Sequence, residues 1–162
     1  MTVEPREGTL GRVPRDAGRL AWELADRVGH AHALFGAVLG GVVAGTPLTV
    51  GEAIALAVLA SAPAGLSQTG LGGALGVTRQ HAHALTRRLA GHRLVRRTRR
   101  GREVRLEPTP RAERLVAELR PGAEARLARA LSGLAPRERR DLHRLCGRLV
   151  EVLAREAGEE RA

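Results

Sequence analysis

The sequence predicts a mainly α-helical protein that carries one small β hairpin. Apolar residues recur every three or four positions through most of the chain, which is the period of helices buried on one face. The stretch 94–107 differs, because two short segments there alternate apolar and charged residues around Gly101. At 162 residues, with 43% hydrophobic and 27% charged residues, the chain is long enough to bury a core of its own.

The N-terminal part divides into a long helix and a shorter one. After a polar tail over 1–13, apolar residues at helical spacing predict a first helix over 15–44. Thr49 and Glu52 then have the spacing of a capping box, in which a hydroxyl and a carboxylate satisfy free backbone amides. We therefore expect a second helix that ends near Ser61.

Two short helices follow with the layout of a helix-turn-helix. Ser67 is a suitable N-cap for a helix over 68–75, and Thr78 for a second helix that Gly91 ends. Because only Gly76 and the next residue connect them, the two helices must cross steeply. The predicted core of this motif consists of Leu71, Leu75, Val77, Ala82, Leu85 and Leu89.

A wing and two more helices complete the predicted fold. The segments 94–98 and 103–107 are predicted strands, and Gly101 supplies the tight turn between them. Thr109-Pro110 combines an N-cap with proline at the first helical position, which opens a fifth helix. Ala135-Pro136 opens a sixth, and both helices carry leucines at helical spacing. The fold class is therefore a winged helix-turn-helix flanked by long helices.

The positive charge of the chain is concentrated in the predicted helix-turn-helix and wing. The formal net charge is +10, and all 27 basic residues are arginines. Ten of these arginines and only one acid fall within 77–105, whereas the rest of the chain is nearly balanced. Such a local excess predicts contact with a polyanion. The near absence of aromatic residues argues against a platform that stacks single-stranded bases.

The second helix of the motif has the chemistry of a DNA recognition helix. Its N-terminal residues should contact base edges, where arginine reads guanine and glutamine reads adenine. The wing arginines suit a minor groove or its phosphates, and a helix N-terminus suits a phosphate. The candidate DNA-binding residues are Thr78, Arg79, Gln80, His83, Arg87 and Arg88 on the recognition helix, Arg97, Arg99, Arg100 and Arg102 on the wing, and Ser67 as an N-cap that contacts a phosphate.

Metal and thiol chemistry are not predicted. His30 and His32, like His81 and His83, are two residues apart, so helical geometry points each pair in different directions. Cys146 is the single cysteine, which excludes an intramolecular disulfide. Its place on the apolar face of the sixth helix predicts a buried, inert thiol.

No pattern in the sequence predicts an enzyme or a cofactor. There is no Ser/His/Asp order, glycine-rich phosphate loop or carboxylate pair. The apolar run over 33–44 is short for a membrane span, and no secretory signal is found, so we expect no membrane partner and a cytoplasmic location.

One further pattern extends from about Leu20 to Leu153. It is carried by the stretches 66–80, 85–89, 91–97 and 99–106, followed by Thr109-Pro110 and a leucine-rich helix. In these stretches the chain resembles the MarR (multiple antibiotic resistance regulator) family of bacterial transcription regulators. The resemblance implies a homodimer built by the first, fifth and sixth helices that represses genes from a pseudo-palindromic operator. It also implies a small apolar or aromatic effector, bound between those helices and the DNA-binding lobe.

The chain departs from the family pattern at two positions. Thr98 stands where the family usually has an acid that helps to hold the wing, which leaves the order of the wing open. Ala84 stands where a polar or basic residue often contacts DNA.

The predicted organisation has five parts, and three functions are compatible with it. The parts are a flexible tail over 1–13, a dimerisation helix over 14–46, a winged helix-turn-helix lobe over 47–108, C-terminal dimerisation helices over 109–157 and a frayed tail over 158–162. Besides a sequence-specific regulator, the alternatives are a DNA-architectural protein without sequence preference and a winged module that binds proteins.

Overall fold

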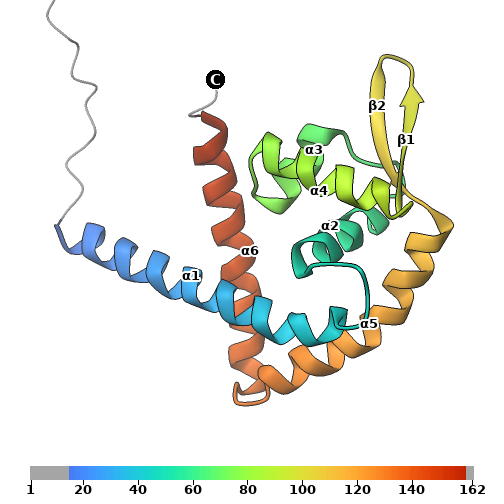
Figure 1. Cartoon of the computed structure of the whole chain (residues 1–162). Coiled ribbons are helices and arrows are strands. Elements are labelled where there is room, and N and C mark those ends of the chain that lie inside the picture. Colours follow the sequence, from blue (N-terminus) through green and yellow to red (C-terminus); the bar gives the residue numbers. More distant parts are fainter. Residues whose placement is uncertain (1–14, 160–162) are drawn as a thin grey trace, which may run out of the picture. The chain divides into compact units, whose positions relative to one another are not determined.

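The computed structural model describes the backbone of residues 15–159. It contains α1 (Arg15–Val43), α2 (Val50–Ala60), α3 (Gln68–Leu75), α4 (Arg79–Gly91), β1 (Val95–Arg100), β2 (Glu103–Pro108), α5 (Pro110–Ala130) and α6 (Pro136–Glu159) (Figure 1). The predicted tail over 1–13 lies outside the described residues, as do residues 160–162 of the second tail. The chain falls into two compact units, of which one ends at Ala37 and the other begins at Val38.

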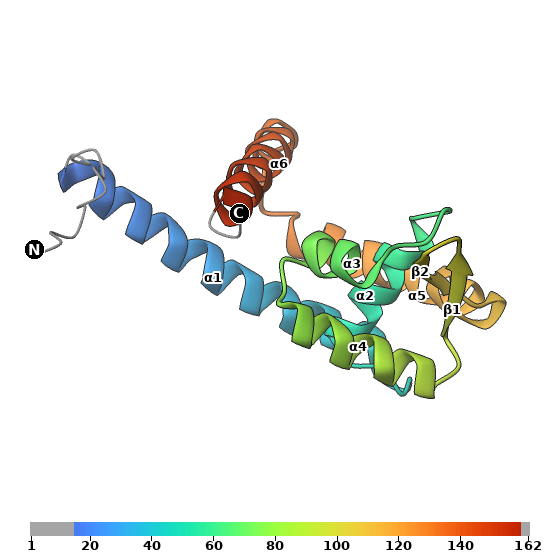
Figure 2. The ribbon, with the colours of Figure 1, turned by 90° about the horizontal axis from the view of Figure 1, so that it is seen from above.

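The second unit has its core in the helix-turn-helix and the base of the hairpin. Both views place α2 next to α3 and α4 (Figures 1 and 2). Leu71, Ala82, Leu85 and Leu89 are buried as predicted, whereas Leu75 and Val77 are half-buried. The other buried apolar residues are Leu48, Ala55, Leu56, Leu59, Leu94, Val95, Leu106 and Ala112. This core joins α2, both helices of the motif, the hairpin and the start of α5.

The helix boundaries follow the predicted caps. Thr49, Ser67, Thr78 and Thr109 each accept a hydrogen bond from the amide three residues further along the chain. Glu52 completes the capping box at α2. Gly76 has φ +63° and ends α3 in the left-handed conformation that glycine adopts without a steric penalty.

The end of α4 differs from the prediction. Gly91 is the last residue of the helix, and the left-handed residue is Arg93, with φ 57°. The amide of Leu94 bonds back to the carbonyl of Leu89 at 2.9 Å, as in a Schellman turn. Both leucines are buried. The left-handed position therefore lies just before the residue that must enter the core.

The hairpin is longer and tighter than predicted. β1 and β2 pair antiparallel with Arg100 opposite Glu103, so that only Gly101 and Arg102 form the turn. Gly101 has φ +62°, the conformation that a two-residue hairpin loop requires. Arg99 and Arg100 consequently lie in the strand and not in the turn. A pair of backbone bonds between Leu66 and Leu106, 3.1 and 2.8 Å long, attaches β2 to the segment before α3.

The helices α1 and α6 expose large apolar side chains. Within the described part of both helices no side chain is buried. Trp22 is 78% exposed and Val150 is 66% exposed. The other large apolar residues exposed on these helices are Leu20, Leu24, Val28, Leu34, Phe35, Leu142, Leu145, Val152 and Leu153. Of the helices in residues 15–159, none combines the length and apolarity needed to cross a membrane.

Two glycines, one within α3 and one at its end, should have opposite effects on stability when they are replaced by alanine. Gly73 is exposed within the helix, and a Cβ added there meets no atom within 4 Å. Because alanine favours a helix interior over glycine, Gly73→Ala should raise the free energy of unfolding by about 1 kcal/mol. Gly76→Ala is the matched control and should lower it by about 1 kcal/mol, since its left-handed φ strains any residue with a Cβ. Urea unfolding monitored by circular dichroism measures both, and an unchanged or lower stability of Gly73→Ala would contradict this account.

Candidate nucleic-acid interface

The recognition helix α4 has one buried side and one exposed side. Ala82, Leu85, Thr86 and Leu89 are buried against the core. The residues predicted to contact DNA from this helix, Thr78, Arg79, Gln80, His83, Arg87 and Arg88, all fall in the exposed class. Their roles toward DNA remain predictions, but the orientation of the helix is the one that its sequence pattern predicts.

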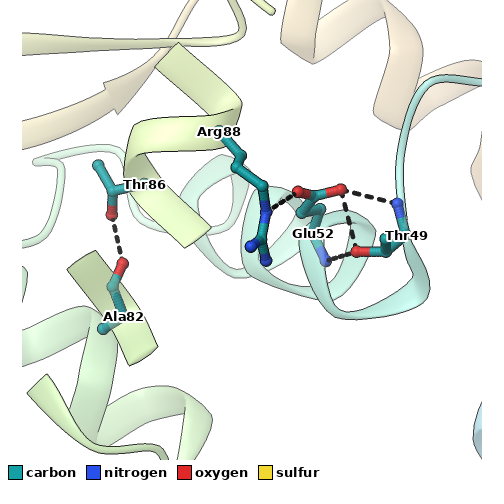
Figure 3. Close-up of polar contacts among 5 residues, drawn as sticks. All are labelled: Thr49, Glu52, Ala82, Thr86 and Arg88. Atoms are coloured by element: carbon teal, nitrogen blue, oxygen red, sulfur yellow. Dashed lines mark hydrogen bonds and ion pairs between the residues drawn. The ribbon is translucent and has the colours of Figure 1, made fainter. Parts of the chain in front are cut away.

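The recognition helix is tied to α3 by a chain of hydrogen bonds. Gln68 Nε2 donates to Thr86 Oγ1 at 3.2 Å. Thr86 Oγ1 in turn donates to the carbonyl oxygen of Ala82 at 2.8 Å (Figure 3). Thr86 is fully buried, so these bonds are shielded from water. Gln68 also lines a shallow hollow together with Arg79, Gln80 and His83. The sequence pattern did not single out Gln68, because its partner lies on the next helix.

The other end of the recognition helix is held by a buried carboxylate. Glu52 is only 2% exposed, and it accepts hydrogen bonds from the amide and the hydroxyl of Thr49 at 2.8 and 2.9 Å. Its second oxygen accepts from Arg88 Nε (Figure 3). Arg88, a predicted DNA contact, is thus also part of the framework. One sequence signal pointed to this pair: Glu52 is the only charged residue between Val28 and Thr78, and a buried charge needs a partner.

The environment of Glu52 keeps its carboxyl ionised. Burial raises the pKa of Glu52, but the Thr49 amide, the Arg88 guanidinium and the Thr49 hydroxyl together outweigh burial and bring the pKa below its ordinary value of 4.5. The ion pair is therefore intact at neutral pH.

The wing is held by a second buried carboxylate on β2. Glu107 accepts hydrogen bonds from Thr98 Oγ1 at 3.0 Å, Arg100 Nη2 at 3.0 Å and Arg96 Nε at 3.2 Å. The Thr98 hydroxyl lowers the pKa of Glu107, burial opposes it, and Arg100 and Arg96 lower it further, so that the net change is downward. Thr98 does not leave the wing without support, because the acid that holds the strands together comes from β2.

Several basic side chains remain available for an external anion. In the 77–105 segment, Arg88, Arg96, Arg100 and Arg105 pair with carboxylates. Arg97, Arg99 and Arg102 on the wing are exposed. Within the described part of the chain, the arginines of this segment that form no ion pair are Arg79, Arg87, Arg93, Arg97, Arg99 and Arg102. The N-cap Ser67, the predicted phosphate contact, is half-buried at the start of α3.

The prediction of a buried thiol was wrong for the single chain. Cys146 is exposed, as are most of the described side chains of α6. His81 and His83 are both exposed on α4. Across residues 15–159, no group of three or more metal-ligating side chains comes together.

Comparison with known proteins places this arrangement of elements in a defined class. No family model and no curated protein sequence matches the chain. Among solved structures, a MarR family transcriptional regulator from a Rhodococcus species matches with a TM-score of 0.72 and 17% identity, covering 81% of this chain and 96% of that one. BpsR of Bordetella bronchiseptica, a protein whose DNA binding is regulated by 6-hydroxynicotinic acid, matches with a TM-score of 0.70 and 21% identity over 78% of this chain and 98% of that one.

A third solved structure is a MarR family protein of Mycobacterium tuberculosis in complex with salicylic acid. It is 26% identical, with a TM-score of 0.60 over 85% of this chain and 96% of that one. The Rhodococcus neighbour is described as a transcriptional regulator, and this chain shares its arrangement of elements. The chain has the fold of the MarR family, as its sequence predicted.

The buried ion pair generates a prediction about stability and pH. Glu52→Gln keeps the shape of the side chain but removes its charge, so it should lower the free energy of unfolding by about 1–3 kcal/mol at pH 7. Because the folded-state pKa of Glu52 lies below 4.5, its contribution is present above that pH and is lost as pH falls through the folded-state pKa. Urea unfolding between pH 7 and pH 3 should therefore show a smaller loss of stability in Glu52→Gln than in the unsubstituted protein. Parallel pH profiles of the two proteins would show that Glu52 is not the titrating group.

Proposed function

We propose that the chain is a sequence-specific transcription regulator that binds double-stranded DNA as a homodimer and represses from a pseudo-palindromic operator. The observation that carries the proposal is that the arginines fall into two groups, those that pair with carboxylates and those that do not. Arg88, Arg96 and Arg100 pair with carboxylates and hold the scaffold. The arginines of α4 and the wing that have no carboxylate partner among the described residues are Arg79, Arg87, Arg97, Arg99 and Arg102. A merely solvated helix face would carry mixed charges.

The geometry supports a specific mode of docking. The N-terminal turn of α4 enters the major groove, where Arg79 and Gln80 contact base edges. Arg99 and Arg102 near the turn of the hairpin reach the adjacent minor groove or its phosphates. Ser67 and Thr78 place two helix N-termini, with their partial positive charge, toward the phosphate backbone.

A second copy of the chain accounts for the exposed apolar faces. Large apolar residues on α1 and α6 are exposed in a single chain, which is unfavourable for a soluble protein. Dimerisation through these helices buries them and provides two recognition helices. In a symmetric dimer those helices meet two half-sites about one DNA turn, roughly 34 Å, apart. The proposed location is the cytoplasm of a bacterial cell, and the activity requires no cofactor.

A cavity in the second unit supports an effector-controlled regulator. It has a volume of about 290 Å³ and is bounded by the end of α1, α2 and α5. Its lining is apolar except for Arg120 and Glu124. Apolar walls with one cation fit a small aromatic acid, the class of compound named for two of the structural neighbours.

Fluorescence anisotropy with DNA from the gene's own upstream region tests the central proposal. Across a salt series, we expect one upstream site to bind at least ~10³-fold more tightly than scrambled DNA. Arg79→Ala should lower affinity for that site by about tenfold to a hundredfold and relax its sequence preference. Arg99→Ala should weaken all sequences alike and reduce the salt slope by about one. Arg129→Ala, an exposed arginine of α5, serves as the matched control and should change neither.

Each alternative function gives a different result in this experiment. Salt-dependent binding without preference would identify an architectural protein, because phosphate contacts carry no sequence information. Absence of binding at low salt would favour a protein-interaction module. Sedimentation of the free protein in the same buffer should give twice the chain mass of 17.3 kDa, and a monomer would contradict the proposed dimer.

Salicylate is a suitable probe of the cavity. It should raise the melting temperature of the protein and release the bound upstream DNA, since a ligand stabilises the state that it prefers. Ala57 lines the cavity on α2, so Ala57→Phe should fill part of it and weaken both responses. A full response in the Ala57→Phe variant would place the ligand elsewhere. No response in either protein would exclude this acid as the effector.

A further inference from the structure

We propose that Gln68 is a specificity-determining residue whose side-chain oxygen accepts a hydrogen bond from the exocyclic amino group of a base in the major groove. This inference rests on the proposed DNA-binding function and adds to it a contact that is separate from the candidate residues on α4 and the wing.

The position of Gln68 is the first observation. Gln68 is the first residue of α3, next to the N-cap Ser67, yet its side chain lines a hollow that it shares with Arg79, Gln80 and His83 of α4. These three residues occupy the first turns of the recognition helix, which are the part of such a helix that approaches base edges. A base edge that lies over this hollow therefore meets Gln68 as well as the recognition helix.

The orientation of the amide group is the second observation. Gln68 Nε2 donates to Thr86 Oγ1 at 3.2 Å. The hydroxyl hydrogen of Thr86 is directed at the carbonyl of Ala82, so Thr86 can only accept from Gln68. Reversing the amide would place two acceptors against each other. One hydrogen of the Gln68 nitrogen therefore stays directed toward Thr86, which fixes the plane of the amide and the direction in which its oxygen points.

The third observation is that this oxygen is open to solvent. Gln68 Oε1 has no hydrogen-bond partner within the described residues, and no buried side-chain oxygen or nitrogen in that part of the chain lacks a partner. An unpartnered oxygen on a half-buried residue must then lie at the surface. It is an acceptor on a residue that lines the same hollow as Arg79, whose guanidinium can only donate hydrogen bonds.

The chemistry of DNA limits what this oxygen can bind. Phosphate oxygens are acceptors only, so the Gln68 oxygen cannot accept a hydrogen bond from them. In the major groove the donors on base edges are the N4 amino group of cytosine and the N6 amino group of adenine. A fixed acceptor at this position therefore selects one of these amino groups and discriminates against a carbonyl oxygen in the same place.

Selection of binding sites from a random DNA library, followed by anisotropy in a salt series, tests the assignment. Gln68→Ala should reduce the preference at one base pair in each half-site by roughly tenfold while leaving the salt slope unchanged. Thr86→Val removes the acceptor that orients the amide but keeps the shape of the buried side chain, and it should relax the same base pair. Thr69→Ala, an exposed neighbour that does not line the hollow, is the matched control and should leave every preference unchanged.

Three results would overturn the proposal. One is a Gln68→Ala variant whose base preferences equal those of the unsubstituted protein, which would leave Gln68 with a structural role alone. Another is a uniform loss of affinity for all sequences, which would indicate a phosphate contact because such contacts carry no sequence information. The last is full preference in Thr86→Val, which would refute the fixed orientation of the amide. If the unsubstituted protein itself shows no sequence preference, the proposed function fails first, and that outcome is recognised before any variant is compared. Urea unfolding of each variant establishes that it is folded.

Discussion

The buried carboxylate of Glu52 constrains the DNA-binding lobe more than any other single group. A charged side chain in a protein interior is unfavourable unless its oxygens are bonded and its charge is compensated. Here the Thr49 amide and hydroxyl provide the bonds and Arg88 provides the charge. Because Thr49 begins α2 and Arg88 lies in the last turns of α4, one carboxylate holds both helices at a single separation.

Glu107 applies the same principle to the wing. Ten arginines within 77–105 repel one another, and a hairpin with basic residues on both strands would be destabilised by its own charge. On one face of the hairpin, Glu107 accepts hydrogen bonds from Arg96, Arg100 and the Thr98 hydroxyl. Two buried acids thus bind three of the ten arginines and fix the recognition helix and the wing. The arginines that remain without a carboxylate in the described chain provide the positive surface.

Local signals in the sequence predicted the helices well, but they could not predict contacts between residues that are distant in the sequence. The caps at Thr49, Ser67, Thr78 and Thr109 depend on residues three positions apart, so they can be identified from the sequence alone. The pairing of Glu52 with Arg88 joins residues 36 positions apart, and it depends on how α2 and α4 pack.

The two local errors both concern the ends of predicted elements. Leu94 has to enter the core, and this requirement moves the left-handed residue from Gly91 to Arg93. In the hairpin, Arg100 pairs with Glu103, so the strands extend further than predicted and leave a turn of only two residues. At the end of α4, core packing thus overrides a glycine signal, whereas Gly101 keeps its predicted place in the turn and only the strand ends differ. Gln68 was missed for a related reason, since only the crossing of α3 and α4 brings it to Thr86.

The two sides of α2 have different partners, and this connects the cavity with the recognition helix. Val50, Ala53, Ile54 and Ala57 line the cavity, whereas Glu52 is directed to Arg88. A short helix moves as a rigid body, so a displacement of the cavity wall also displaces the carboxylate that holds α4. A ligand changes DNA affinity only if it binds the two positions of α2 with different free energies. In the proposed effector-controlled regulator, the ion pair would set how much of that difference reaches the DNA, because a looser attachment between Glu52 and Arg88 would let α2 move while α4 remains in place.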